Sequence, residues 1–285
     1  MSSHFHPLSV LTRFLLACSL VAWHSFAHAQ REFRVYQSFE GEDGESALPA
    51  DWNVPAGFVV GRLMYPSTVG FGFFRRGGDW RRGGTSWSVD YPKGDRALIT
   101  ALRRYIRADV RAVEQPVNPE DGDDIFNWPY LTVGLAGYWQ LDDEFAAKLR
   151  EYLLRGGFLF CDSFFDSRSW IGFERGMKQI FPDRRIVDLT DDEVVFHSFF
   201  DLPGMTQVQI PNMNALYYGN GYLGDGAVPH WRGIFDDEGR LMVLIAFNND
   251  VSDAWQWADE PSYPADKANL GLRIGVNIVL YTLTH

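Results

Sequence analysis

The sequence predicts an α/β domain with a mainly parallel sheet that is covered by helices on both faces. From residue 58 onward, short apolar segments alternate with amphipathic segments of helical period. Several apolar segments end abruptly in polar residues, as strands do at the ligand-binding edge of an open parallel sheet. The short connections favour right-handed crossovers, which give parallel pairing. Residues 141–165 (LDDEFAAKLREYLLRGGFLFCDSFF) show all these features in one stretch.

The first 29 residues have the features of a secretory signal peptide. Arg13 precedes an apolar run at 14–23, and Ala27-His28-Ala29 fits the rule for a cleavage site. The run is shorter than the roughly 20 residues needed to span a bilayer. We therefore expect cleavage after Ala29, a periplasmic or secreted protein, and no transmembrane segment after cleavage.

Composition limits the class of partner. The formal net charge of −11 argues against nucleic acid or an anionic membrane as a partner. With 46% apolar residues, the chain can bury the core of one large domain, which we expect over residues 58–285. Residues 30–57 are acidic and contain glycine and proline, a composition typical of a flexible lead-in. Cys161 is the one cysteine left after cleavage, so no internal disulfide is expected.

The first half of the domain is predicted to contain four strands and two helices. The expected strands are 58–65, 110–114, 130–136 and 158–161, and the expected helices are 95–107 and 142–155. Asp142 has the residue type of an N-cap, with two acidic residues in the first turn behind it. Gly156 suits the left-handed position that follows a helix.

The second half of the domain has a less regular pattern. We expect a helix at 170–181, a weak strand at 185–189, an aromatic turn with His197, a loop-rich stretch at 204–226, a hairpin formed by 231–235 and 240–247, and a final helix at 267–283. The turn of the hairpin is Asp-Asp-Glu-Gly.

Residues 68–87 contain a local duplication, Arg-Arg-Gly-Gly at 75–78 and again at 81–84. Arginines among glycines could form an anion-binding lid, because glycine lets backbone N–H groups approach a ligand. A solvated flexible loop over a strand end explains the same composition. Export and net acidity disfavour the single-stranded nucleic acids that such motifs bind elsewhere.

Six ordered segments resemble the bacterial domain of unknown function family 4159. They are SWSVDYP (86–92), RGGFLFCDSF (155–164), WIGFERGMKQIFP (170–182), FHSFFD (196–201), GIFDDEGRLMVLI (233–245) and NNDVSDAWQWADEPSYP (248–264). The resemblance covers roughly residues 58–285. It implies a flavodoxin-like three-layer domain similar to the class I glutamine amidotransferases. The family has no assigned biochemical activity, so the resemblance concerns architecture more than function.

The resemblance draws attention to Cys161. In catalytic amidotransferases the nucleophilic cysteine lies on a tight turn after a strand, and Cys161 is within a residue of that place. The local sequence Cys-Asp-Ser lacks the glycine-flanked elbow, and no His-x-Glu follows it. We therefore expect Cys161 to be a small buried apolar residue.

Asp162 is the leading candidate for chemistry because it ends the fourth strand. A structural role, in capping the next helix or pairing with Arg168, competes with this interpretation. Asp250 or His197 could assist it in catalysis. The candidates for ligand binding flank the same sheet edge and are Asp90, Tyr91, Ser163, Arg168, Asn248, Asn249, Asp253 and Trp255. Carboxylates, amides and aromatics together suit a sugar-like or peptide-like ligand, although a hydrogen-bonded omega loop would explain residues 248–257 equally.

No cofactor is expected. A metal could be held by Asp162, Asp250, Asp253 and His197, but these residues show no metal-ligand spacing, so no metal is predicted. Two classes of function stay open. The first is a non-catalytic module of the cell envelope that binds a small polar ligand or an envelope protein. The second is a hydrolase of a glycoside, amide or ester that uses Asp162 with Asp250 or His197.

Overall fold

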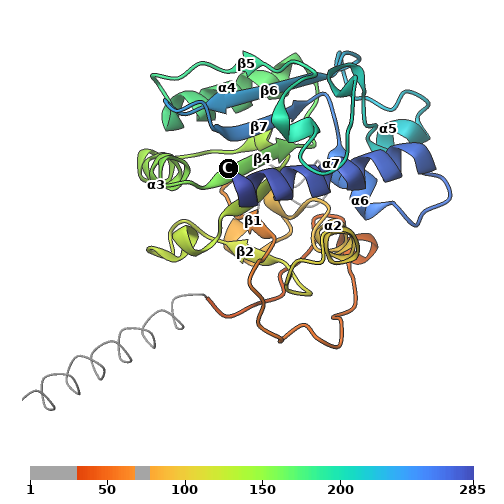
Figure 1. Cartoon of the computed structure of the whole chain (residues 1–285), viewed down its shortest axis with the longest axis horizontal. Helices are drawn as coiled ribbons and strands as arrows, with labels where there is room; N and C mark the ends of the chain where they lie inside the picture. Colours follow the sequence, from red (N-terminus) through yellow and green to blue (C-terminus); the bar gives the residue numbers. More distant parts are fainter. Residues whose placement is uncertain (1–30, 68–77) are drawn as a thin grey trace, which may run out of the picture. The chain divides into compact units, whose positions relative to one another are not determined.

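The computed structural model describes residues 31–67 and 78–285, and Phe33–His285 form one compact unit (Figure 1). The expected signal peptide and the first Arg-Arg-Gly-Gly run, apart from Gly78, lie outside the described residues. Residues 33–57 are part of the same compact unit as the domain that follows them. Within the described ranges, no helix has both the length and the apolar character needed to cross a membrane.

One seven-stranded sheet organises this unit, with the strand order β2-β1-β3-β4-β7-β6-β5. Its strands are β1 (Gly61–Leu63), β2 (Gln115–Val117), β3 (Tyr130–Gly134), β4 (Phe158–Asp162), β5 (Val187–Asp188), β6 (His230–Phe235) and β7 (Leu241–Phe247). The five strands from β2 to β7 pair in parallel, whereas β6 and β5 are antiparallel. With β7 counted as the fifth strand, the parallel part has the doubly wound order 2-1-3-4-5. The prediction of an α/β fold with a mainly parallel sheet is confirmed.

Helices cover both faces of the sheet (Figure 1). They are α2 (Lys93–Tyr105), α3 (Asp143–Leu154), α4 (Asp166–Ile180), α5 (Met213–Tyr217), α6 (Val251–Gln256) and α7 (Ala265–Thr284). Short 3₁₀ turns occur at Gly41–Gly44, Trp80–Arg82, Ser86–Ser88, Asp124–Asn127, Ala136–Tyr138, Val194–Phe196 and Met205–Gln207. Buried side chains of α3 and α4 form one core layer, and those of α2, α6 and α7 form the other.

Strand β4 shows how the two layers divide the chain. Leu159 and Cys161 belong to the α3/α4 layer, while Phe158 and Phe160 belong to the α2/α6/α7 layer. Successive side chains of a strand point to opposite faces, so Asp162 follows Phe160 onto the second face. All five residues of β4 are buried, which explains its almost continuous apolar sequence.

The helix–strand unit in the middle of the chain forms as predicted. Asp142 caps α3, because its side chain accepts a hydrogen bond from the Phe145 N–H at 2.8 Å. Such a cap stabilises a helix by about 1 kcal/mol. Gly156 follows the helix with φ +104°, the left-handed conformation that glycine adopts without strain. The β6–β7 hairpin is also confirmed, with Gly239 at φ +84° in its turn.

Three elements differ from the expected boundaries. The regular ladder of the second strand lies at β2 rather than at 110–114, where Val110 makes only an isolated bridge to Phe58. Pro116 is tolerated there because β2 is an edge strand. Helix α4 begins four residues earlier than expected, at Asp166. After β7 the chain forms helix α6 rather than a loop, and six residues are too few for a helical period to be recognised in the sequence.

Candidate functional site

Four buried aspartates meet at the C-terminal ends of β4 and β7. Asp162 ends β4, Asp250 caps the N-terminus of α6 after β7, and Asp253 lies in the first turn of α6. Asp90 comes from the segment just before α2. None of the four is more than 6% exposed. We call Asp90, Asp162, Asp250 and Asp253 the carboxylate cluster.

Sharp turns at the two strand ends bring these residues together. Ser163 and Asn248 have φ of +58° and +57°, and Asp90 has φ +58°. Two backbone hydrogen bonds join the turns, from Ser163 N–H to the Asn249 carbonyl (3.1 Å) and from Asn248 N–H to the Phe164 carbonyl (3.0 Å). Left-handed backbone at non-glycine residues costs about 1–3 kcal/mol at each position and is concentrated at functional sites.

Two serines link the carboxylates. The Ser163 Oγ lies 2.6 Å from Asp250 Oδ1, 3.3 Å from Asp90 Oδ2 and 2.9 Å from Ser252 Oγ. Ser252 donates from its N–H and its hydroxyl to Asp162 Oδ2, at 2.8 and 2.9 Å. One hydroxyl carries one proton, so Ser163 can donate to only one carboxylate at a time.

Neutral donors at the start of α5 and at the end of α6 bond the carboxylates of Asp250 and Asp253. Asn212 Nδ2 donates to Asp250 Oδ2 (2.8 Å) and Asp253 Oδ2 (3.1 Å), and Met213 N–H donates to Asp253 Oδ2 at 2.6 Å. The Trp257 indole donates to Asp253 Oδ1 at 3.0 Å. Sequence reasoning missed Asn212, although its position three residues before Ala215, whose N–H it caps, is an N-cap signal.

The environment of the cluster opposes ionisation. Burial, followed by the neighbouring charge of Asp90, raises the pKa of Asp162 to about 7. Burial also raises the pKa of Asp90, and it raises those of Asp250 and Asp253 well above the usual range. A hydrogen bond between Asp90 and Asp253 favours the proton on Asp253. Four buried carboxylates therefore need protons or a cation to balance their charge.

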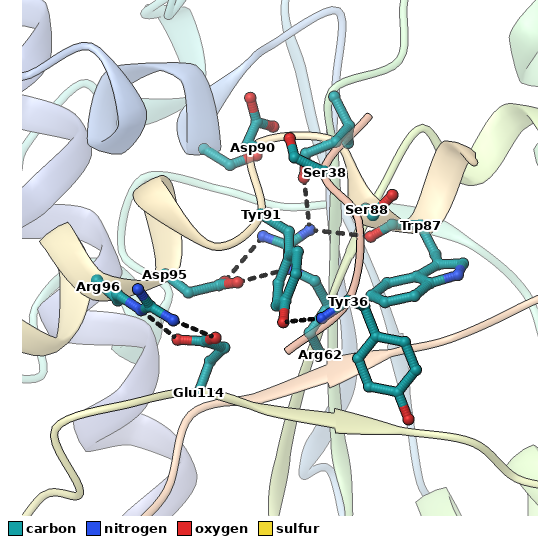
Figure 2. Close-up of polar contacts among 12 residues, drawn as sticks. Tyr36, Ser38, Arg62, Trp87, Ser88, Asp90, Tyr91, Asp95, Arg96 and Glu114 are labelled. Carbon is teal, nitrogen blue, oxygen red and sulfur yellow. Dashed lines mark hydrogen bonds and ion pairs between the residues drawn. The ribbon is translucent and has the colours of Figure 1, made fainter. Parts of the chain in front are cut away.

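Arg62 on β1 is a buried cation near the cluster, but its hydrogen bonds go elsewhere. Its guanidinium donates to both oxygens of Asp95 at 2.8 Å, and also to the carbonyls of Val89 (2.9 Å) and Trp87 (3.3 Å). Figure 2 shows the Asp90 carboxylate pointing away from this pair. The charge of Arg62 lowers the pKa of Asp90 without a direct contact.

A fifth acidic residue approaches from the N-terminal segment. The Asp90 N–H donates to Glu40 Oε1 at 3.1 Å, and Ser38 donates to Glu40 Oε2 at 2.8 Å. Burial, followed by the charge of Asp90, raises the pKa of Glu40 to about 8. The segment before residue 58 therefore contributes directly to the surroundings of the cluster.

The other residues expected on this edge have structural contacts. Asn248 accepts from the Asp166 N–H (3.1 Å) and donates to the Val228 carbonyl (2.6 Å), so it fixes the turn after β7. Asn249 accepts from the Ile210 N–H at 2.8 Å. Tyr91 is buried, and its hydroxyl accepts from the Tyr36 N–H at 3.1 Å.

Trp255 and His197 make their contacts away from the cluster. The buried Trp255 donates its indole to the Gly271 carbonyl and packs against Phe160, which makes it a core residue. Both ring nitrogens of His197 are taken, by Asp201 and by the Asp191 carbonyl.

Arg168 is exposed on α4 and makes no hydrogen bond to the cluster among the residues that the structure describes. Cys161 is buried on the opposite face of β4, where burial raises its thiol pKa well above the usual range. A thiolate nucleophile therefore has no support at this position.

Three of the four aspartates have the geometry of a metal site. One oxygen each from Asp90, Asp250 and Asp253 lies within 4.8 Å of the other two. Carboxylate oxygens are the ligands that hard cations such as Ca²⁺ and Mg²⁺ prefer. His197, which the sequence suggested as a possible ligand, is not part of this group.

A separate cavity of about 450 Å³ lies beside α4 and the β5–β6 edge, lined by Trp170, Arg184 and Arg232 among others. Both arginines are already paired, Arg184 with Asp237 and Arg232 with Asp188. These two arginines are compensated within the protein, so the carboxylate cluster is the stronger candidate for a functional site.

The fold and the site together define an α/β domain with a buried acidic centre at its ligand-binding edge. The model of the family described as domain of unknown function (DUF4159) matches residues 78–283, which is more than half of the chain. The chain belongs to this family. The matched range includes all four aspartates of the cluster. A comparison with curated proteins finds no match.

Proposed function

We propose that this chain is an exported, non-catalytic binding domain of the cell envelope whose ligand is held at the C-terminal ends of β4 and β7. The observation that carries the proposal is the carboxylate cluster, which three distant segments build. Within residues 31–67 and 78–285, its carboxylates accept hydrogen bonds from serine, asparagine, indole and backbone N–H donors and from no cationic side chain. Buried charges of one sign are costly to the fold, and a bound ligand is a physical reason to keep them. Export rests on the signal-peptide pattern of residues 1–29.

We also propose that the domain is related to the class I glutamine amidotransferases. The strand order supports this relation, and so does the polar turn at the end of β4. The residue with left-handed backbone in that turn is Ser163, two positions after Cys161. Cys161 is buried and its thiol pKa is raised, so it is not a ready nucleophile. This difference from catalytic amidotransferases supports a binding role for the site.

A hydrolase is the second candidate, and one observation favours it. Ser163 Oγ lies 2.6 Å from Asp250 Oδ1, the distance expected between a nucleophile and its general base. Asp162, held through Ser252, would then be an acidic neighbour of this pair. Against catalysis, Ser163 is only 3% exposed and His197 is bonded elsewhere.

Turnover assays separate the two candidates. We expect no hydrolysis of p-nitrophenyl esters, p-nitrophenyl glycosides or peptide p-nitroanilides by the purified protein. Ser163→Ala and Asp162→Asn are the informative variants. Ser198→Ala is the matched control, because its hydroxyl bonds the Val194 carbonyl outside the cluster. Turnover that disappears in the first two variants and persists in the control would establish a hydrolase.

Calorimetry with soluble peptidoglycan fragments, which carry both sugar and peptide groups, tests binding. Asp162→Asn should weaken this binding about tenfold or more, a loss of about 1.4 kcal/mol. Equal affinity in the wild type and this variant would place the ligand elsewhere on the protein.

A further inference from the structure

The spacing of Asp90, Asp250 and Asp253 matches the size of one coordinated ion. Their nearest oxygens lie within 4.8 Å of one another. Calcium–oxygen distances are about 2.3–2.6 Å, so oxygens on opposite sides of one Ca²⁺ lie up to about 4.6–5.2 Å apart. A single ion can therefore contact all three carboxylates without moving the backbone.

Buried polar atoms without partners flank the same place. Asp162 Oδ1 has no hydrogen-bond partner within the described part of the chain, and the same holds for both amide atoms of Gln256. Asp162 is fully buried and Gln256 is 1% exposed. Asp162 lies close enough to Asp90 and Asp250 for their charges to act on one another. Unpartnered buried groups of this kind point to an ion or a ligand.

Gly94 shows that Gln256 and Asp90 face the same position. A Cβ on Gly94 would lie 3.3 Å from Asp90 Cβ, 3.6 Å from Gln256 Cβ and 3.2 Å from the Ser252 carbonyl. The first turn of α2 and helix α6 thus close around Asp90. Gln256, whose amide has no partner in the described part of the chain, thus projects from α6 beside the backbone that carries Asp90.

We propose that Asp90, Asp250 and Asp253 bind one hard divalent cation, which supplies the positive charge that the cluster lacks. The inference rests on the proposed function, because it places a bound ion in the same binding centre. Among the described residues, no lysine, arginine or histidine donates a hydrogen bond to these three carboxylates.

The donor set favours Ca²⁺ over other common divalent ions. All three ligands are oxygens, whereas protein zinc sites are built mainly from histidine nitrogen and cysteine sulfur, with carboxylate oxygen as an added ligand. Mg²⁺ keeps several of its waters, which a site with ligands no more than 6% exposed does not readily accommodate. Ca²⁺ replaces its waters with protein oxygens and tolerates irregular geometry.

The groups around the three ligands already fix their orientation. Asn212 bonds Asp250 and Asp253 together, Ser163 bonds Asp250, and Trp257 holds Asp253 Oδ1. Outer hydrogen bonds of this kind orient ligands in metal sites and raise metal affinity. A proton shared between Asp90 and Asp253 is the competing way to neutralise the cluster, and it makes different predictions.

Thermal unfolding of chelator-treated protein distinguishes the cation from the proton. Ca²⁺ at about a hundred times its dissociation constant should raise the melting temperature by about 5–10 °C. Asp90→Asn should abolish this shift. Asn tolerates the left-handed backbone of residue 90, so this variant changes charge with little backbone strain.

Asp166→Asn is the matched control. Asp166 also has left-handed backbone, at φ +72°, but its side chain accepts from the Ser169 N–H within the first turn of α4. This variant should keep the full Ca²⁺ shift. The proposal is overturned if neither Ca²⁺ nor Mg²⁺ raises the melting temperature and elemental analysis of the untreated protein finds no bound metal. An equal Ca²⁺ shift in the wild type and Asp90→Asn also overturns it.

Terbium luminescence tests the site in the wild type, should Asp90→Asn fail to fold. Tb³⁺ occupies calcium sites and is excited by nearby tryptophan, and Trp257 is hydrogen-bonded to Asp253 at 3.0 Å. The expected signal is displaced by Ca²⁺ and falls in Trp257→Phe. No Ca²⁺-displaceable signal would contradict the proposal. Peptidoglycan binding without any metal would overturn this inference alone, whereas metal binding with Ser163-dependent turnover would overturn the non-catalytic function alone.

Discussion

Two groups of buried acidic side chains lie next to each other near the start of α2, and they differ in how their charge is balanced. Asp95 and Glu114 each face an arginine, in the pairs Arg62–Asp95 and Arg96–Glu114 (Figure 2). The carboxylate cluster is bonded by serine, asparagine, indole and backbone donors. Compensation by an arginine therefore distinguishes the buried acids that stabilise the fold from those that belong to a site.

The arginine pairs fit a structural role because each carboxylate is fully used. Both oxygens of Asp95 accept from Arg62, and both oxygens of Glu114 accept from Arg96, at 3.0 and 3.2 Å. Arg96 also donates to the carbonyls of Ser46 and Ala47, which attaches the N-terminal segment to α2. A buried pair with all its hydrogen bonds made is tolerated, whereas one left without its partner is strongly destabilising.

The largest effect is expected from breaking a compensated pair. Arg62→Met should lower the free energy of unfolding by about 3–5 kcal/mol, because it leaves the fully buried Asp95 without its counter-charge. It also leaves the carbonyls of Val89 and Trp87 without this donor. Chemical denaturation monitored by circular dichroism measures the loss.

The double variant Arg62→Met/Asp95→Leu is the control for this prediction. Removing both charges should restore much of the lost stability, since apolar residues often replace a buried ion pair at little cost. A loss below about 1 kcal/mol in the single variant would show that Asp95 is not dependent on Arg62.

Removing a charge from the cluster should raise the free energy of unfolding, whereas removing Arg62 lowers it. In the presence of chelator, Asp162→Asn should be more stable than the wild type above pH 7, by an amount on the order of 2 kcal/mol. The pKa of Asp162 is raised to about 7 in the folded state, mainly by burial. Below the ordinary carboxyl pKa of about 4, both states hold the proton and the variant has no advantage.

The stability of the wild type should therefore fall between pH 4 and pH 7, as the unfolded state loses a proton that the folded state keeps. Urea unfolding of both proteins across this range measures the difference. Thr132→Val on the neighbouring strand is a suitable control, because it alters a fully buried polar residue that carries no charge. A difference between wild type and Asp162→Asn that is the same at pH 4 and pH 8 would exclude an ionisation effect.

The aspartates at the two strand ends were predictable from sequence because they follow recognisable apolar runs. Asp162 comes directly after Phe158–Cys161, and Asp250 and Asp253 come soon after the strand that ends at Phe247. Parallel pairing of β4 and β7 then brings these ends together. The position of Asp90 just before the first helix suggested that it reaches the same edge.

The compensating partners could not be predicted in the same way. Arg62 interrupts an apolar strand, and nothing local indicates that it reaches Asp95, 33 residues later. Asn212 reaches Asp250 and Asp253 from a loop-rich stretch without a strong period. Trp255 and Arg168 are close in sequence to residues of the cluster, but they are not part of it. Helix α6 places Trp255 in the core, and α4 places Arg168 at the surface. Short helices change which side chains face a site, and six residues carry too little pattern to show it.

The smallest effect is expected where the same pair geometry is exposed. Arg150 donates to both oxygens of Asp183 at 2.8 and 3.0 Å, much as Arg62 does to Asp95, but the two side chains are 32% and 56% exposed. The hydrogen bond from Arg150 lowers the pKa of Asp183 to about 2. The stabilisation is therefore present above pH 4 and disappears as the pH falls through about 2. Carbon-detected NMR titration of the carboxyl should locate this transition, and Asp183→Asn should change the unfolding midpoint at pH 7 far less than Arg62→Met does. If the two variants were equally destabilising, burial would not be what separates a structural ion pair from a surface one.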